Sequence, residues 1–401
     1  MKKLIIVLVI ICLLFAGAIG YFSMGGDIIA DTPEDTAPDA ETQPAEDAAQ
    51  AEPVAAKTLD YDALYASHDP DAVVMTVGGK DVKWSEYYSL LYGNAQQLET
   101  AAAYYGIADV WNESVSENSS ETFAVMPVTN AEGTLQQFAS IETVAEQNQV
   151  TLDADAEAAM AADKQAAIVS VCGEDGTEED FRAALDGMHM SEEAYDRQIR
   201  VGQLYKAGFA KLYGADGANV PDEDAIKFLE DGGYIYASHI LLTTMDMSTG
   251  EALDEAAAAE KKATADKLYA ELAAIEDTAA LVKRFAELKS EYCEDTGKTA
   301  YPDGYVFAPG SFVAEFEDAA KAMGDYGLSE PVLSSYGYHI ILRLPPDPDA
   351  VMQYTDAGVA QTARSLCAES EYNATLEATM ANMTIVYADG FTAPNLLDYV
   401  K

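Results

Sequence analysis

Two strand-like segments constrain the fold of this chain more than any other feature. They are "YIYASHILLT", residues 234–243, and "YGYHIILRL", residues 336–344, and each carries one of the 4 histidines found in 401 residues. Both are rich in residues that favour β-strands, whereas three patterns between them place apolar residues three or four positions apart. The order strand, three helices, strand predicts a compact α+β domain over 234–346, with a small sheet flanked by helices.

The residues before this domain are mainly helical in pattern. A short strand–turn–strand pattern comes first, and amphipathic helical patterns follow as far as residue 213. One of these helices begins at "TEEDFRAAL", where Thr177 and Asp180 have the spacing of a capping box. We therefore expect a mainly helical module over 60–233.

The C-terminal residues 347–401 contain too few secondary-structure elements to fold alone. They contain one helical pattern, about 355–382, and one strand pattern, "MTIVYADG". A single helix and a single strand bury too little apolar surface for a core. We expect residues 350–390 to return to the 60–233 module and complete it, which makes 234–346 an inserted domain.

The N-terminus has the pattern of a targeting segment. Lys2 and Lys3 precede an uncharged and mostly apolar run from Leu4 to Phe22, which is nearly long enough to span a bilayer. We expect residues 1–23 to anchor the protein to the cell membrane, with an extracytoplasmic remainder. The alternative is a signal peptide, cleaved near Ala16-Gly17-Ala18, and secretion. Cys12 lies inside the apolar run, so lipid attachment there is not expected.

Charge limits the partners of the exported part. Residues 24–59 consist largely of Ala, Pro, Asp, Glu and Thr, and predict a disordered acidic linker. The whole chain has 23 Lys and Arg against 69 Asp and Glu, a formal charge of −46. This charge excludes nucleic acid and anionic membrane surfaces as expected partners. It favours solubility outside the cell, with attraction of basic clients as the alternative.

The segment 234–346 resembles the parvulin-type peptidylprolyl isomerases. The resemblance lies in four pieces in family order: "ASHILL", "FAELKSEYCEDTG", "FAPGSFVAEFEDAAKAM" and "LSEPVLSSYGYHIILRL". The flanking "VMTVGGKDVKWSEYY" and "TEEDFRAALDGMHMSEEAYDRQIR" resemble the chaperone module of export-linked parvulins, the SurA/PrsA-like foldases. The resemblance implies a chaperone-like helical module with an inserted isomerase domain. Its partners would be unfolded or proline-containing exported polypeptides.

The resemblance also implies the residues of the site. Five polar residues are implied for the catalytic part: His239, His339, Asp295, Cys293 and Ser334. Three aromatic residues are implied for the proline pocket: Phe307, Phe312 and Phe316. Rotation about a prolyl bond needs no nucleophile, metal or cofactor, so we expect none. The histidines would orient and polarise, because a pair on neighbouring strands can form a network with hydroxyl and carboxyl groups.

One turn departs from the family pattern. Where parvulins have a Gly-Gly-Asp-Leu-Gly-like turn, this chain has "YPDGY", with Gly304 in place of a pocket leucine and Tyr305 in place of a glycine. The departure favours an alternative function, a holdase that binds unfolded polypeptides with weak or no isomerase activity. A cell-surface structural protein is a third reading, which the proline-pocket residues argue against.

Overall fold

The computed structural model describes residues 56–401 except 117–118, 247 and 356–357. The expected membrane anchor, 1–23, and nearly all of the expected acidic linker lie outside the described residues. The chain divides into two compact units. The first holds the described residues up to Leu212 together with Tyr372–Lys401, and the second is Tyr213–Glu371.

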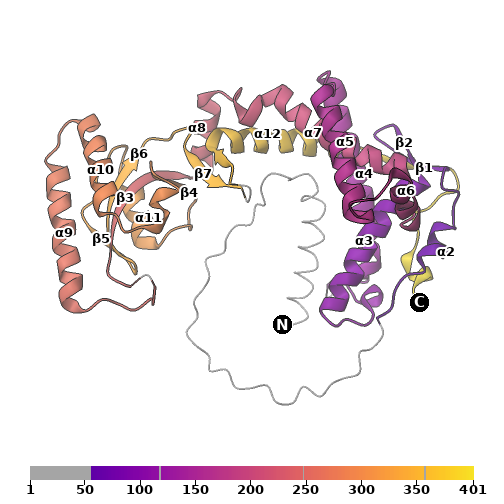
Figure 1. Cartoon of the computed structure of the whole chain (residues 1–401), viewed down its shortest axis with the longest axis horizontal. Helices are drawn as coiled ribbons and strands as arrows, with labels where there is room; N and C mark the ends of the chain where they lie inside the picture. Colours follow the sequence, from indigo (N-terminus) through magenta and orange to yellow (C-terminus); the bar gives the residue numbers. More distant parts are fainter. Residues whose placement is uncertain (1–55, 117–118, 247, 356–357) are drawn as a thin grey trace, which may run out of the picture. The chain divides into compact units, whose positions relative to one another are not determined.

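The first unit is mainly helical. Its helices are α2 (Tyr61–Tyr65), α3 (Trp84–Tyr104), α4 (Met126–Gln147), α5 (Ala154–Cys172), α6 (Glu178–Gly187) and α7 (Glu192–Tyr213), which reaches the unit boundary (Figure 1). The predicted capping box at the start of α6 is confirmed. The Thr177 hydroxyl accepts from the Asp180 backbone N–H at 3.2 Å, and the Asp180 carboxylate accepts from the Thr177 N–H at 3.0 Å.

A three-stranded sheet joins the two ends of this unit. Its order is β2 (Lys80–Lys83), β1 (Val73–Val77), β9 (Ile385–Tyr387), and β1 is antiparallel to both neighbours. Gly78 and Gly79 have φ of 57° and 80°, the left-handed values that a two-residue hairpin turn requires. Because β9 comes from the C-terminal residues, the sheet and the core beneath it need both ends of the described chain.

The second unit is built on a four-stranded antiparallel sheet of order β4-β3-β6-β5. Its strands are β3 (Ile235–Thr243), β4 (Tyr305–Phe307), β5 (Val332–Leu333) and β6 (Gly337–Leu344). Apolar side chains of α9 (Glu255–Ala273) and α10 (Thr278–Tyr292) pack in one core cluster with one face of the sheet. Those of α11 (Ala314–Ala322) pack with the other face. The predicted α+β fold is confirmed.

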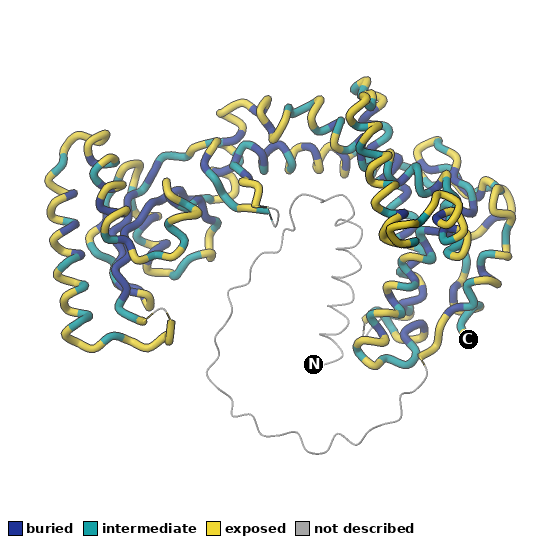
Figure 2. Tube along the Cα trace, viewed as in Figure 1, coloured by how far each residue is buried: buried dark blue, intermediate teal, exposed yellow. Residues whose placement is uncertain are grey.

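Every residue of β3 is buried, because the strand lies inside the sheet with helices over both faces (Figure 2). This explains why "IYASHILLT" reads as an uninterrupted run of strand-forming residues rather than an alternating one. A polar side chain on such a strand is costly unless it finds a hydrogen-bond partner. The position of His239 on β3 therefore requires partners nearby.

The structure corrects the expected helix over 355–382. Strand β7 (Val351–Tyr354) pairs antiparallel with β8 (Ala360–Thr362), and helix α12 runs only over Ala363–Met380. Gly358 has φ of 75°, a turn conformation that a helix excludes. Arg364 pairs with Asp349 at 2.8 Å and with Asp222, at the start of α8 (Asp222–Asp231), at 2.6 Å. The compact unit is thus wider than 234–346, whose independent folding stays a prediction.

Short 3-10 helices complete the described elements: η1 (Val110–Asn112), η2 (Phe123–Val125), η3 (Ala215–Gly217), η4 (Thr296–Thr299) and η5 (Leu396–Tyr399).

Replacing Phe391 tests whether the C-terminal segment shares the core of the first unit. Phe391 is 8% exposed, and its ring lies 6.1 Å from Trp84 and 6.2 Å from Tyr87. Phe391→Ala should lower the free energy of unfolding by about 3 kcal/mol, since it removes a buried ring. Both tryptophans of the chain, Trp84 and Trp111, are buried in this core, so their fluorescence reports denaturant unfolding of this unit.

Val386→Ala is the matched control on the same segment. Val386 lies on β9 and is 59% exposed, so its loss should change the unfolding free energy by less than about 0.5 kcal/mol. Equal effects of the two substitutions would show that Phe391 adds nothing to this core.

Candidate active site

The two buried histidines meet because of the register between β3 and β6. His239 is opposite Ile341, and His339 is opposite Leu241. The two rings are therefore diagonal neighbours on one face of the sheet. Their Nδ1 atoms are 3.4 Å apart, and each residue is 4% exposed.

Each outer ring nitrogen has a polar partner. His239 Nε2 lies 2.9 Å from Asp295 Oδ2, and His339 Nε2 lies 2.7 Å from the Ser334 hydroxyl. Asp295 caps η4 and also accepts the backbone N–H of Gly297 at 3.0 Å. The four side chains thus form one line of contacts, and the structure brings together four of the five polar residues implied for the site.

A glycine sets the position of the hydroxyl end. Gly337 opens β6 with φ of 144°, and a Cβ there would come within 2.2 Å of the Leu242 carbonyl oxygen. Its carbonyl accepts the Ser334 N–H at 2.9 Å, which closes the tight connection between β5 and β6. Any side chain at Gly337 would push β6 away from β3, so this turn depends on the glycine.

Burial and hydrogen bonding set the charges of the line. Burial raises the pKa of Asp295, but hydrogen bonds from His239, Tyr305 and the Gly297 N–H outweigh it, so the pKa lies well below its usual range. Burial and the neighbouring His239 lower the pKa of His339 to about 3. At neutral pH the line therefore ends in a carboxylate and contains an uncharged His339.

When both rings are neutral, the hydrogen bonds run in one direction. The carboxylate only accepts, so His239 donates from Nε2 and accepts at Nδ1. His339 then donates from Nδ1 and accepts at Nε2 from the Ser334 hydroxyl. The Ser334 oxygen in turn accepts the Tyr336 N–H at 3.1 Å. Every polar atom of the line is satisfied, as burial requires.

Three phenylalanines form an apolar wall beside the histidines. The ring of Phe316, on α11, is 5.2 Å from His239 and 5.4 Å from His339. Phe312 stacks on Phe316 at 5.1 Å, and Phe307, on β4, is 4.6 Å from Phe312. Phe312 is only partly buried, so the group reaches the surface there. The arrangement is an aromatic wall standing over a polar floor.

A buried carboxylate holds the loop that carries Phe312. Glu317, 6% exposed, accepts the backbone N–H groups of Gly310 and Phe312 at 2.8 and 2.9 Å. Lys321 pairs with its other oxygen at 3.4 Å. The loop before α11 is thereby tied to the helix, which fixes the aromatic wall relative to the sheet.

The structure places Cys293 apart from this line. Its thiol lies against the β3 backbone, accepting the Leu241 N–H at 3.4 Å and lying 3.7 Å from the His239 carbonyl oxygen. The residue belongs to the core cluster beneath the other face of the sheet. Burial raises the pKa of this thiol, so it stays protonated at neutral pH and is a poor nucleophile.

Sequence reasoning missed Tyr305, which it treated only as a departure from the family turn. The Tyr305 hydroxyl donates to Asp295 Oδ2, the oxygen that also faces His239. One signal was available: Tyr305 and Phe307 are two residues apart in a strand pattern, so both side chains share a face. The register places Tyr305 opposite Ala237, on the face of β3 that carries His239.

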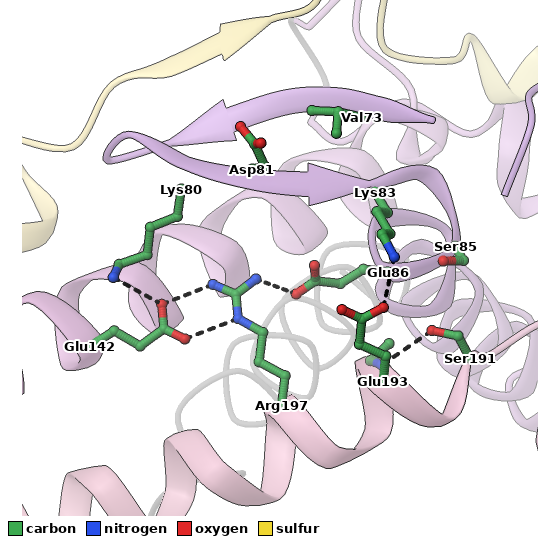
Figure 3. A pocket seen from close by; sticks show the side chains of 11 residues that line it. Val73, Lys80, Asp81, Lys83, Ser85, Glu86, Glu142, Ser191, Glu193 and Arg197 are labelled. Atoms are coloured by element: carbon green, nitrogen blue, oxygen red, sulfur yellow. Dashed lines mark hydrogen bonds and ion pairs between the residues drawn. The ribbon is translucent and has the colours of Figure 1, made fainter. Parts of the chain in front are cut away.

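A pocket of about 390 Å³ lies in the first unit, whereas His239 and His339 belong to the second. Figure 3 shows Arg197 between Glu86 and Glu142 within it. The Arg197 guanidinium bonds both oxygens of Glu142 at 3.0 Å, and Lys80 lies 3.8 Å from the same carboxylate. These contacts join α7 to α3 and α4. The central charges are already paired, so we interpret the pocket as a structural ion-pair network.

Acid should weaken the second unit through His339. The His339 pKa falls from 6.5 in the unfolded chain to about 3 in the fold, so the unfolded state binds more protons between these values. Stability from this group is complete above pH 6.5 and is lost as the pH falls toward 3. The loss should reach about 2 kcal/mol at pH 5. Native-state hydrogen exchange of the β3 and β6 amides measures it.

His339→Gln is the control for this titration, because it keeps an amide near Ser334 and removes the ionisable ring. The variant should be less stable at pH 7, and its stability should change less between pH 6.5 and 5. Parallel pH dependence in the two proteins would mean that another group carries the effect.

Comparison with known proteins agrees with this geometry. Residues 239–344 match the model of the rotamase family, the PPIC-type PPIase domain. Foldase protein PrsA 1 of Bacillus cereus is 50% identical over 60 residues, which is 15% of this chain and 21% of the relative. PrsA of Oceanobacillus iheyensis is 29% identical over 215 residues, 53% of this chain and 59% of the relative. The chain thus spans less than two thirds of these relatives.

Solved structures give weaker similarities. PrsA from Bacillus subtilis has a TM-score of 0.24 at 20% identity, covering 63% of this chain and 82% of its own. A structure of the SurA-like chaperones PEB4 and Cj1289 of Campylobacter jejuni has a TM-score of 0.22 at 15% identity, covering 77% and 94%. The family match and the curated relatives confirm the resemblance seen in the sequence. Residues 239–344 therefore match the PPIC-type peptidylprolyl isomerase domain, in a chain that is similar to the PrsA foldases.

Proposed function

We propose that this protein is a peptidylprolyl cis/trans isomerase that assists the folding of exported polypeptides. One observation carries the proposal: the line Asp295–His239–His339–Ser334 lies directly beside Phe316 within the parvulin domain. An apolar wall and a polar floor are the two surfaces that a proline ring and its twisting amide require. The clients would be unfolded or proline-containing chains, and no cofactor is needed.

The chemistry is rotation about one bond. The prolyl amide has a barrier of about 18–20 kcal/mol, because rotation removes resonance between nitrogen and carbonyl. A site lowers this barrier when it binds the twisted amide better than either planar form. Phe312, Phe316 and Phe307 would hold the proline ring, and the polar line would orient groups around the carbonyl. The charge distribution of the amide changes as it twists, and fixed dipoles in a site that excludes water stabilise the twisted form strongly.

The histidines would act by shape and electrostatics rather than by proton transfer. His339 is uncharged at neutral pH because burial and His239 lower its pKa to about 3, so it is a poor general acid there. The Cys293 thiol lies behind β3 and is protonated, so no covalent step is proposed for it. These features support an arrangement whose main property is rigidity.

Export and anchoring belong to the same proposal. The N-terminal lysines and the apolar run to Phe22 would hold the protein at the membrane with its folded part outside the cytoplasm. Among the residues that the structure describes, no helix is long and apolar enough to cross a bilayer. The proposal therefore rests on the sequence of residues 1–23. The acidic residues 24–59 would serve as the tether.

A holdase is the second candidate function, and one observation favours it. Gly304 stands where the family has a pocket leucine, so that position contributes no side chain to the wall. In this candidate the module of 60–233 and 350–390 would bind unfolded chains, and the parvulin domain would turn over slowly. Measured isomerase activity separates the two.

Cis/trans exchange in an unstructured Ala-Pro peptide, followed by NMR, tests the proposed activity. The intact protein should accelerate exchange, and Phe316→Ala should reduce the acceleration by about ten-fold, since it removes the ring that touches both histidines. His239→Ala should reduce activity and also stability, because Asp295 loses a buried partner. Cys293→Ser should have a mild effect.

Phe285→Ala is the matched control for the loss of a buried ring. Phe285 is 2% exposed, lies on α10 and belongs to the core under the opposite face. It should destabilise the domain about as much while leaving exchange per folded molecule near the wild-type value. Wild-type protein without exchange activity would remove the isomerase and leave the holdase. Complete loss in folded Cys293→Ser would place chemistry on the thiol.

Membrane retention tests the anchoring part. Reporter fusions after residue 60 should be active outside the cytoplasm, and Cys12→Ser should leave the protein in the membrane fraction. Release of Cys12→Ser into the medium would instead indicate a lipid anchor. Release of the unaltered protein would support cleavage of a signal peptide.

A further inference from the structure

The turn that departs from the family lies too close to β3 to carry a side chain at its glycine. Gly304 has φ of 134°, and a Cβ there would lie 2.7 Å from the Ala237 carbonyl oxygen and 3.0 Å from its carbonyl carbon. These are backbone atoms of β3, which cannot rotate away. In this chain residue 304 therefore cannot be leucine, and another residue must supply this part of the aromatic wall.

Tyr305 occupies this side of the site. Its ring centroid is 5.5 Å from that of Phe312 and 5.6 Å from that of His239. Phe312 belongs to the aromatic wall and His239 to the polar floor, so one ring joins the two surfaces. The Tyr305 hydroxyl donates to Asp295 Oδ2, which lies 2.9 Å from His239 Nε2. One carboxylate oxygen thus holds the tyrosine and the histidine together.

The turn is held from two further directions. Lys289, 4% exposed on α10, donates to the carbonyl oxygens of Tyr301 and Pro302 at 3.1 and 2.8 Å. The Tyr354 hydroxyl, on β7, donates to the Ala300 carbonyl at 2.9 Å. The Tyr301 ring lies 4.9 Å from that of Tyr305. β7 lies beyond the residues that match the parvulin family, so a neighbouring strand braces the site.

We propose that Tyr305 is a positioning residue of this isomerase site, whose hydroxyl fixes the Asp295 carboxylate against His239 and whose ring supplies the wall beside Phe312. The inference rests on the proposed peptidylprolyl isomerase function and deepens it. The departure from the family turn is then a replacement: the backbone at Gly304 approaches β3, and the next residue fills the space.

The hydroxyl also affects the charge of Asp295. The titratable groups around this carboxylate are His239 on β3, Tyr305 on β4, His339 on β6, Lys289 on α10 and the Cys293 thiol. Of these, His239 and Tyr305 donate hydrogen bonds to it. Without the Tyr305 hydroxyl the carboxylate loses one stabilising donor, so its pKa rises. A protonated Asp295 can donate a hydrogen bond as well as accept one. It then no longer determines which ring nitrogen of His239 carries the proton.

Tyr305→Phe separates the hydroxyl from the ring. In the intact protein it should stay folded, lower the exchange rate of an Ala-Pro peptide by about ten-fold and change the ring NMR signals of His239. The acid limb of its pH–rate profile should move to higher pH, because Asp295 becomes protonated at a higher pH. Tyr305→Leu should lower the exchange rate further, since the aromatic wall is lost as well.

Tyr338→Phe is the matched control. Tyr338 is on β6 beside His339, but its ring packs against the opposite core, so neither the pH profile nor the His239 signals should change. A Tyr305→Phe protein with the wild-type profile and His239 signals would overturn the positioning role. Equal exchange rates for the Phe and Leu variants would overturn the role of the ring.

The failure of the proposed function gives a different result. If the wild-type protein shows no exchange with any peptide, the isomerase proposal fails, but the His239 ring signals still report on Asp295. A change in these signals in Tyr305→Phe, and none in Tyr338→Phe, would uphold the positioning contact. Unchanged signals in both would overturn it.

Discussion

The antiparallel pairing of β3 with β6 is the constraint on which the rest of the parvulin domain depends. It runs without a register shift from Tyr236 opposite Leu344 to Thr243 opposite Gly337. A slip of one residue would turn His339 to the other face and separate it from His239. Gly337 helps to hold this register, because its backbone passes so close to Leu242 that no side chain fits. The register between β3 and β6 therefore determines the geometry of the site as well as that of the sheet.

The two faces of this sheet have different roles. Side chains of α9 and α10 make an apolar core under one face, and that core holds the strands rigid. The other face carries polar groups buried beside α11. In such surroundings a hydrogen bond is strong, and a missing partner is costly. The line from Asp295 to Ser334 is acceptable because each nitrogen and oxygen in it has a partner. Because every donor and acceptor is paired, these side chains are also held rigidly.

The altered turn shows how a fold can compensate for a change in one loop. With Gly304 pressed against β3, the side chain that faces the site comes from Tyr305, one residue later. Lys289 and Tyr354 then bind the carbonyl groups of the turn from α10 and β7. Tyr354 lies outside the matched residues 239–344, so a neighbouring segment takes part in shaping the site.

Local periodicity in the sequence was enough to predict the α+β fold, both histidine strands and the capping box of α6. These features depend on residues within a few positions of one another, so the pattern contains them. The polar partners of the histidines were predicted from the family resemblance, whereas the distances between these side chains come from the structure. The strand pair β7 and β8 was missed, because two short strands next to a helix give no decisive period in the sequence. Only the tertiary structure placed Cys293 behind β3 and Tyr305 on Asp295. Cys293 is the C-cap residue of α10, and Tyr305 follows the turn at 301–304. The positions of both depend on contacts with the distant strand β3 rather than on neighbouring residues.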